Sequence, residues 1–77
     1  MRRIIDGLLY DTDTAEIIYE DNTNNRHRVY YKTANGRFFV VYQTGELAPK
    51  TEAQIKELLG TYDVDKYIEL FNEPKEA

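Results

Sequence analysis

Carboxylates near the start of the chain are the side chains whose spacing best suggests chemistry. Asp11, Asp13 and Glu16 stand two and three residues apart, as do some ligands in carboxylate sites for Ca²⁺ or Mg²⁺. The glycine and the distal glutamate of a calcium-binding loop do not follow them. We therefore favour a turn whose acids point to water over a metal site, and we expect no metal and no cofactor.

The two commonest nucleophiles of hydrolases, serine and cysteine, are absent. The chain contains no Ser and no Cys, and its single histidine, His27, cannot form a paired-histidine metal site. None of the seven Thr carries the signature of a threonine nucleophile, and the four Gly are scattered singly, so no phosphate-binding loop is present. A carboxylate pair needs a deep cleft to act as acid and base, which a chain of 77 residues rarely forms, so we predict a protein that is not an enzyme.

The length and composition are those of one small folded domain, residues 1–77. A chain of this size buries only about 60% of the surface that its unfolded form exposes, so a partner or dimerisation could add stability, and both a monomer and a homodimer fit. Seven Tyr and three Phe argue against disorder, and the lack of Cys fits a reducing cytosol. Only Ile4 and Ile5 separate the first basic residues from Asp6, too few for a signal peptide, so we expect a cytoplasmic protein without membrane contact.

The charges are arranged in blocks along the chain. Residues 4–21 hold six carboxylates and no Lys or Arg, whereas residues 26–37 hold four basic residues and His27 without an acid. Residues 51–77 then hold seven acids against three Lys, which accounts for the net charge of −4. Such blocks bear on association and solubility and say little about the fold.

The segment VYYKTANGRFFVVY, residues 29–42, carries the clearest structural signal. Asn35-Gly36 tolerates the positive φ that both positions of a type I′ turn require, so the pattern predicts a hairpin with a two-residue turn. One face, expected to be the core, would then carry Val29, Tyr31, Thr33, Phe38, Val40 and Tyr42. The hydrophobic residues on the other face would be Tyr30, Phe39 and Val41. That second face is more apolar than solvent requires, so we expect another segment or a partner to cover it.

Shorter segments upstream are also read as β structure. Asp6-Gly7 separates two apolar runs and indicates either a second tight hairpin or a strand with a glycine bulge. The segment AEIIYE, residues 15–20, predicts a strand, with a helix over 13–20 as the weaker alternative. The polar segment 20–27 predicts a loop.

After Pro49 the hydrophobic period changes to that of a helix. Thr51 and Gln54 form a capping box ahead of apolar residues at helical spacing, namely Ile55, Leu58, Leu59 and Tyr62. Gly60 suits the C-terminal cap, and Asp63 can cap a second, shorter helix. The predicted fold is therefore α+β, an antiparallel sheet of about four strands with one long and one short C-terminal helix on one face, and residues 72–77 as a frayed tail.

The basic block has two interpretations. A small nucleic-acid-binding module could use its cations for phosphates and its aromatic rings for bases, with the residues Arg26, Arg28, Tyr30, Lys32, Arg37 and Phe39. The pI near 4.9 and the acidic segments on both sides argue against this module, because they would repel a bound nucleic acid. We favour pairing of the basic block with the acidic block across neighbouring strands.

About half of the chain resembles a group of small proteins from mobile elements. The segments RRIIDGLLYDTDTAEII, YYKTANGRFFVVY and DVDKYIELF, in this order, are similar to small, mostly uncharacterised proteins of phages and conjugative elements of low-GC Gram-positive bacteria. Those proteins are typically longer, with a Gly-rich insert between hairpin and helix that is missing here. Anti-CRISPR proteins are found among such elements, and this chain is similar to them in size, acidity and lack of catalytic residues.

The resemblance implies an inhibitor that binds a type II RNA-guided effector nuclease and blocks DNA binding or cleavage, since the cationic DNA channel of such a nuclease would attract an acidic protein. From charge and predicted face, the expected contacts are Asp11, Asp13, Glu16, Glu20 and Asp21, with Asp63, Asp65, Glu69 and Glu73 as a second set and Tyr30, Phe39 and Val41 as an apolar anchor. The alternatives are an accessory or regulatory protein of the same element that binds another protein, or the nucleic-acid-binding module.

Overall fold

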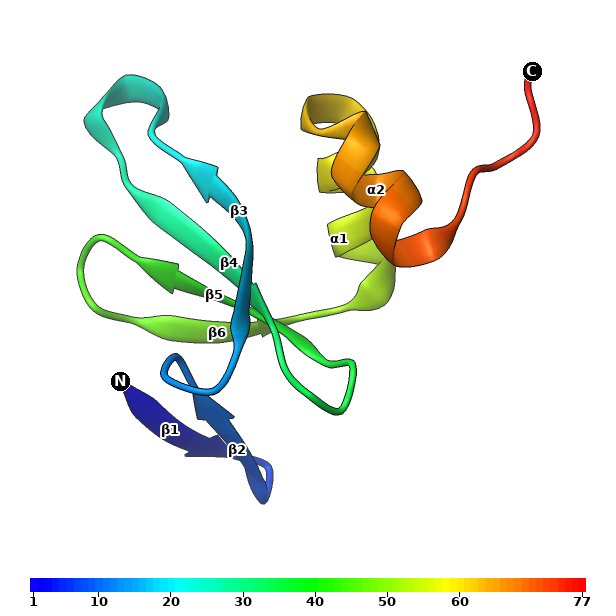
Figure 1. Ribbon diagram of the computed structural model, residues 1–77. Helices are drawn as coiled ribbons and strands as arrows, with labels where there is room; N and C mark the ends of the chain where they lie inside the picture. Colours follow the sequence, from blue (N-terminus) through cyan, green and yellow to red (C-terminus); the bar gives the residue numbers. More distant parts are fainter.

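The computed structural model describes residues 1–77, which form an α+β fold of two antiparallel sheets followed by two helices (Figure 1). The four-stranded sheet has the order β3-β4-β5-β6, and β1 and β2 form a separate two-stranded sheet. The elements are β1 (Arg2–Ile5), β2 (Leu8–Asp11), β3 (Glu16–Asp21), the short 3₁₀ helix η1 (Thr23–Asn25), β4 (Arg28–Lys32), β5 (Phe38–Tyr42), β6 (Leu47–Lys50), α1 (Glu52–Tyr62) and α2 (Val64–Phe71).

Strands β1 and β2 form the tight hairpin that was one of the two interpretations of Asp6-Gly7. Ile5 pairs with Leu8, so only Asp6 and Gly7 lie in the turn, and both have positive φ, 52° and 77°. At the open end of the hairpin, the Thr12 backbone N–H donates to the Met1 carbonyl at 3.0 Å. Figure 1 shows this hairpin apart from the two helices.

The central hairpin β4–β5 differs from the predicted register by one residue. Tyr30 pairs with Val40 and Tyr31 with Phe39, where the two-residue turn would have paired Tyr31 with Val40. The loop contains three residues, 34–36, because only Gly36 takes a positive φ, and its N–H donates to the Thr33 carbonyl at 3.0 Å. This geometry is a common alternative to the two-residue turn, and the dipeptide Asn-Gly does not distinguish the two.

The one-residue change moves the β4 side chains to the opposite face from the prediction, because side chains alternate along a strand. Tyr30 lies on the helix-facing side with Phe38 and Val40, and Tyr31 lies on the other side with Phe39. The buried cluster beneath the helices consists of Ile18, Tyr30, Phe38, Val40, Ile55 and Leu59. The predicted core face was therefore correct for β5 and wrong for β4.

The second face of the sheet is covered by the chain itself around Phe39. The Phe39 ring is fully buried, stacks on Tyr31 at 4.9 Å between centroids, and meets the Tyr10 ring edge-on at 5.5 Å. Tyr10 belongs to β2 and is also buried, so the β1–β2 hairpin covers this part of the sheet. The apolar second face is thus explained at Phe39 by an internal contact.

An irregularity in β3 places two neighbouring hydrophobic side chains on the helix-facing side. The pairing with β4 shifts between Ile17 and Tyr19, so Ile17 opposes Tyr31 and Tyr19 opposes Tyr30. Ile18 is buried in the core cluster and Tyr19 packs against that cluster. After this β-bulge, Asp21 pairs with Arg28 and faces the helix side. The strand predicted over 15–20 is therefore confirmed, and the alternative helix over 13–20 is wrong.

The helices begin where the sequence predicts. The Thr51 hydroxyl accepts from the Gln54 N–H at 3.1 Å, and the Gln54 side chain accepts from the Thr51 N–H at 2.9 Å. Asp63 caps α2 by accepting from the Lys66 N–H at 3.2 Å. Gly60 does not end α1, which continues to Tyr62, because the capping Asp63 is the residue that separates the two helices.

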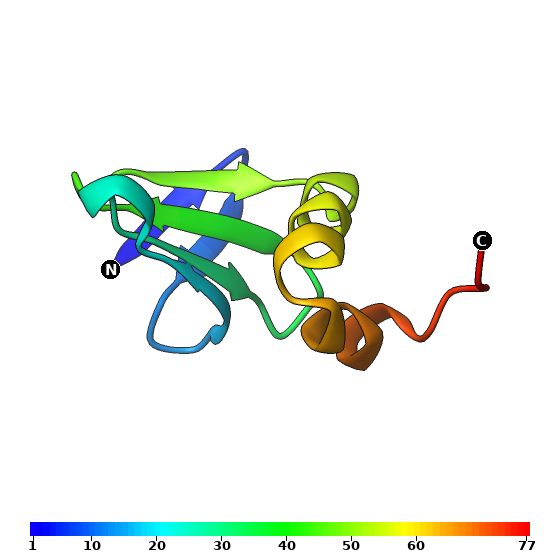
Figure 2. The ribbon, with the colours of Figure 1, turned by 90° about the horizontal axis from the view of Figure 1, so that it is seen from above.

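Strand β6 is an element that the sequence did not reveal. It pairs with β5 at the edge of the sheet, where Pro49 opposes Phe39. A proline is tolerated in an edge strand because its missing N–H faces no neighbouring strand. Figures 1 and 2 show that residues after α2 extend away from the body. Neither α1 nor α2 has the length and hydrophobicity that a membrane-spanning helix requires.

Candidate functional site

The structure brings together acidic residues from the two ends of the chain. The Lys66 ammonium of α2 lies 2.7 Å from Glu69 Oε2 and 3.4 Å from Glu16 Oε2 at the start of β3. Only 18% of the Lys66 side chain is exposed, so Lys66 offsets the charge of Glu16 and Glu69 while presenting little surface to a partner. Two acidic segments that are 50 residues apart in sequence therefore become neighbours.

A cluster of tyrosines lies next to these acids, at the junction of β3 with the helices. Tyr19 stacks on Tyr62 with centroids 6.4 Å apart and contacts the Tyr30 ring at 6.1 Å. Burial raises the pKa of the Tyr19 phenol, and the charges of Asp21 and Asp63 raise it further. Carboxylates from the end of β3 and from the start of α2 thus flank the same aromatic ring.

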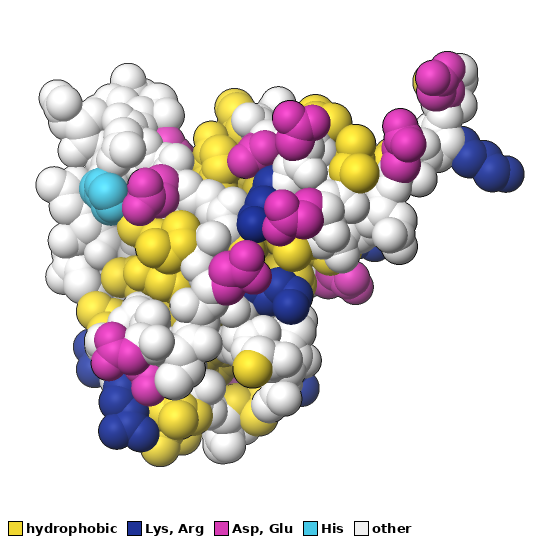
Figure 3. All heavy atoms as spheres, viewed as in Figure 1, with side chains coloured by type: hydrophobic (Ala, Val, Ile, Leu, Met, Phe, Trp, Pro, Cys, Tyr) yellow, Lys and Arg dark blue, Asp and Glu magenta, His cyan; other side chains and the backbone are white.

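Two hydrophobic side chains are exposed at the same junction. Tyr62, the last residue of α1, is 69% exposed, and Val64, the first residue of α2, is 55% exposed. Asp65 lies four residues before Glu69, on the same side of α2, and is also exposed. We call this region the acidic–aromatic surface, formed by Glu16, Tyr19, Asp21, Tyr62, Asp63, Val64, Asp65 and Glu69. In Figure 3, carboxylates and hydrophobic side chains alternate over β3 and α2.

Several acids on this surface also have structural roles. The Thr23 N–H donates to Asp21 Oδ1 at 2.9 Å, and the Arg28 guanidinium lies 3.2 Å from Asp21 Oδ2. Hydrogen bonding by the hydroxyl and the backbone amide of Thr23 lowers the pKa of Asp21. Asp63 is the N-cap of α2, so Asp65 is the acid that can be altered with least effect on the fold.

The remaining predicted acids are not part of this surface. Asp11 pairs with Arg2 at 3.4 Å and accepts from the Asp13 N–H at 2.9 Å, which closes the turn between β2 and β3. Figure 1 shows this turn on the opposite side of β3 from α2. Glu20 pairs with Val29, so it faces the other side of the sheet, and Glu73 lies beyond α2.

The predicted apolar anchor is not a single exposed surface. Tyr30 is buried in the core beneath the helices, whereas Phe39 is buried on the opposite face and Val41 is half-buried there. Tyr62 and Val64 are the exposed large hydrophobic residues at the junction of the two helices, and the others lie in residues 1–17, namely Met1, Ile4, Leu8, Leu9 and Ile17. The sequence pattern placed Tyr62 in the apolar repeat of the first helix, and no local signal shows that this end of the helix lies beyond the sheet that covers its other apolar residues.

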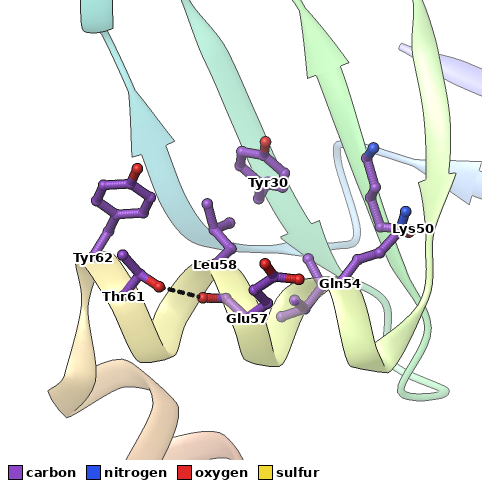
Figure 4. Close-up of a pocket in the computed structure, with 8 residues that line it drawn as sticks. Tyr30, Lys50, Gln54, Glu57, Leu58, Thr61 and Tyr62 are labelled. Carbon is purple, nitrogen blue, oxygen red and sulfur yellow. Dashed lines mark hydrogen bonds between the residues drawn. The ribbon is translucent and has the colours of Figure 1, made fainter.

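A groove runs between α1 and the helix-facing side of the sheet (Figure 4). Its cavity of about 420 Å³ is lined by Tyr30, Lys50, Gln54, Ile55, Glu57, Leu58, Thr61 and Tyr62. The Thr61 hydroxyl donates to the Glu57 carbonyl at 2.9 Å, as it would in an ordinary helix. In Figure 4, Lys50 and Tyr62 lie at opposite ends of the groove. The arrangement fits an apolar or aromatic partner side chain better than a nucleophile with its base.

The predicted pairing of the basic and acidic blocks forms at one position. Arg28 and Asp21 are cross-strand neighbours and make an ion pair, whereas Lys32 makes none although it pairs with Glu16 in register. No group of three or more His, Cys, Asp or Glu could hold a metal ion. No family model matches the chain, and no curated protein or solved structure is significantly similar to it.

Proposed function

We propose that this protein is a non-enzymatic inhibitor from a mobile genetic element, an anti-CRISPR protein that acts in the bacterial cytoplasm. It binds a type II RNA-guided effector nuclease and blocks DNA binding or cleavage. The proposal rests on the resemblance of three segments to mobile-element proteins and on one structural observation. That observation is the acidic–aromatic surface, on which the two acidic ends of the chain meet.

The charge of this surface supports binding to a cationic site. The surface holds five carboxylates, two of which, Glu16 and Glu69, share the single amine of Lys66, and Asp21 is paired with Arg28. The DNA channel of an RNA-guided nuclease is lined with Lys and Arg that hold the nucleic-acid backbone. Carboxylates on a folded scaffold can occupy such a channel in place of phosphates, and charge complementarity also accelerates association.

The exposed hydrophobic residues supply the affinity that exposed charges alone rarely provide. Tyrosine is enriched among residues that dominate binding energy, and Tyr62 is 69% exposed and directly precedes Asp63, the N-cap of α2. Its ring is held against Tyr19, so little side-chain freedom is lost when a partner packs on it. Protein interfaces commonly combine aromatic residues with polar and charged residues around them.

The burial of Tyr30 and Phe39 counts against the nucleic-acid-binding module. Both rings were candidate stacking platforms, but they lie on opposite faces of the sheet and are covered by α1 and by Tyr10, respectively. Stacking of bases requires an exposed ring face. A protein target is therefore the proposal that uses the exposed residues.

The first test is a DNA-cleavage assay with purified type II effectors from Gram-positive bacteria. The protein is added before or after guide RNA and target DNA. We expect inhibition only when it is added before the DNA, because occupation of the channel must precede the duplex. If no effector is inhibited under either order, the anti-CRISPR proposal fails, and an accessory protein with a partner from its own element becomes the better explanation.

Two charge reversals locate the contact. Asp65→Lys alters the acidic–aromatic surface, and Asp13→Lys makes the same change of charge in the β2–β3 turn; neither carboxylate has a salt-bridge partner. We expect Asp65→Lys to weaken inhibition about tenfold and Asp13→Lys to have little effect. Equal losses would mean that only net charge matters, and a loss confined to Asp13→Lys would move the contact to that turn.

A further inference from the structure

The basic block identified in the sequence is divided by the structure into two separate groups. Arg28 opposes Tyr42 at one end of the β4–β5 hairpin, and Lys32 opposes Phe38 at the other end, next to Arg37. Arg26, His27 and Arg28 therefore stay together near the β5–β6 turn, away from Lys32 and Arg37. The proposed function does not use the first group.

These three residues line a cavity between two loops at one end of the sheet. The cavity has a volume of about 450 Å³, within the range of small-molecule sites, and its lining is Arg26, His27, Arg28, Tyr42, Gln43, Thr44 and Glu46. Three of these side chains are basic, three are neutral hydrogen-bonding groups and one is acidic. The cavity thus concentrates positive charge on a protein whose net charge is −4.

One hydrogen bond links the two loops that line the cavity. The His27 backbone N–H donates to the Gln43 side-chain oxygen at 3.3 Å, which ties the β3–β4 loop to the β5–β6 turn. In that turn, the Tyr42 N–H donates to the Glu46 carbonyl at 2.8 Å, and Gly45 has a φ of 91°. The β5–β6 side of the cavity is therefore a hydrogen-bonded turn that is joined to the β3–β4 loop at Gln43.

The basic side chains have hydrogen-bonding capacity that the protein does not satisfy. Arg28 Nε is buried and has no hydrogen-bond partner, and the only contact to a carboxylate from this guanidinium is the 3.2 Å ion pair of its Nη2 with Asp21. Arg26 and His27 make no ion pair. A buried donor without an acceptor destabilises the unliganded protein, and a bound acceptor that drew the guanidinium toward the cavity would relieve this cost.

We propose that this cavity binds a phosphate group, either free or as the monoester of a small molecule. Arginine presents planar donors that match phosphate oxygens in pairs, and two arginines, Arg26 and Arg28, line the cavity. The Thr44 hydroxyl and the Tyr42 phenol line the cavity as further neutral donors. The volume exceeds that of phosphate alone, so an organic group attached to the phosphate also has room.

Glu46, the one acidic residue in the lining, offers a test in which a substitution should strengthen phosphate binding. Glu46 is exposed, and its carboxylate opposes a bound anion in the same cavity. Removing this charge must therefore tighten phosphate binding if the anion occupies the cavity. Removing the charge of Arg26 must weaken it, and Arg37, an exposed arginine at the far end of the hairpin, is the matched control.

The experiment is a titration of ¹⁵N-labelled protein followed by NMR, with inorganic phosphate and adenosine monophosphate as separate probes and sodium chloride holding ionic strength constant. We expect saturable shifts in the amides of residues 26–28 and 42–46 and in the Arg28 Nε–H signal. Arg26→Gln should weaken binding about tenfold, as for the loss of one charge-assisted hydrogen bond. Glu46→Gln should tighten it several-fold, and Arg37→Gln should leave it unchanged within about twofold.

The two probes separate the sources of the phosphate group. Equal affinity means that the phosphate alone is recognised, whereas tighter binding of the nucleotide means that the attached group also occupies the cavity. The proposal is overturned if neither probe gives saturable shifts, or if Arg37→Gln weakens binding as much as Arg26→Gln. None of these outcomes depends on inhibition of a nuclease.

Discussion

The Lys66 ammonium in α2 lies 3.4 Å from the Glu16 carboxylate in β3, which joins the second helix to the first strand of the main sheet. The same ammonium is 2.7 Å from Glu69. A single cation therefore contacts carboxylates from both acidic segments, and its charge offsets part of their mutual repulsion. The acidic–aromatic surface depends on this relationship.

Lys66→Gln should lower the free energy of unfolding by about 0.5–1 kcal/mol at neutral pH, since partly exposed ion pairs contribute at this level. The hydrogen bond to Glu69, followed by that to Glu16, raises the pKa of Lys66 above its usual 10.5. A raised pKa means that the stabilisation is complete below pH 10.5 and is lost as the pH rises through the folded-state pKa. Urea denaturation of both proteins across this range should show the difference disappearing, and a constant difference would contradict the role of the ion pairs.

Phe39→Ala should lower the free energy of unfolding by about 3–5 kcal/mol, because the ring is fully buried between Tyr10 and Tyr31. The milder Phe39→Leu should lose about 1–2 kcal/mol and remain folded for measurement. Ile4→Ala is the control, because Ile4 is 75% exposed on the outer side of the β1–β2 hairpin. If urea denaturation of Phe39→Leu matched that of Ile4→Ala, the ring would not be part of a core.

Two glycines should respond to alanine in opposite directions. Gly60→Ala should raise the free energy of unfolding by about 0.5–1 kcal/mol, since Gly60 lies inside α1 and an added Cβ meets only the Tyr67 ring at 3.8 Å. Gly36→Ala should lower it by about 1 kcal/mol, because φ at Gly36 is +83°. Thermal denaturation of both variants measures the contrast. A destabilised Gly60→Ala would mean that Tyr67 cannot accommodate the methyl group.

Asp63→Ala should lower the free energy of unfolding by about 1 kcal/mol, because it removes the side-chain acceptor for the Lys66 N–H at the start of α2. Asp63→Ser should restore most of the loss, since serine is also a good N-cap residue. Asp65→Ala is the control, because Asp65 is the second residue of α2 and does not cap it. This substitution should change the free energy of unfolding by less than about 0.5 kcal/mol. Equal losses for Asp63→Ala and Asp63→Ser would attribute the effect to charge and not to capping.

Much of the local structure follows from the sequence. The capping box at Thr51, the cap at Asp63 and the hairpin around Asn35-Gly36 each depend on groups within a few residues of one another, whereas Asp6-Gly7 fitted both a hairpin and a strand with a glycine bulge. The length of the second turn was not predictable, because the dipeptide Asn-Gly suits both two- and three-residue loops. A single residue of difference there exchanged the faces of Tyr30 and Tyr31, and with them the predicted apolar anchor.

The sequence by itself determined the α+β class, the starts of both helices and the segregation of charge into blocks, because these features arise from short-range spacing and composition. Only the tertiary structure decided that Lys66 joins Glu16 to Glu69, that Tyr10 covers Phe39 and that Tyr62 stays exposed. These contacts join residues far apart in the chain. They depend on how the helices and the β1–β2 hairpin pack on the sheet, and no local pattern in the sequence encodes that packing.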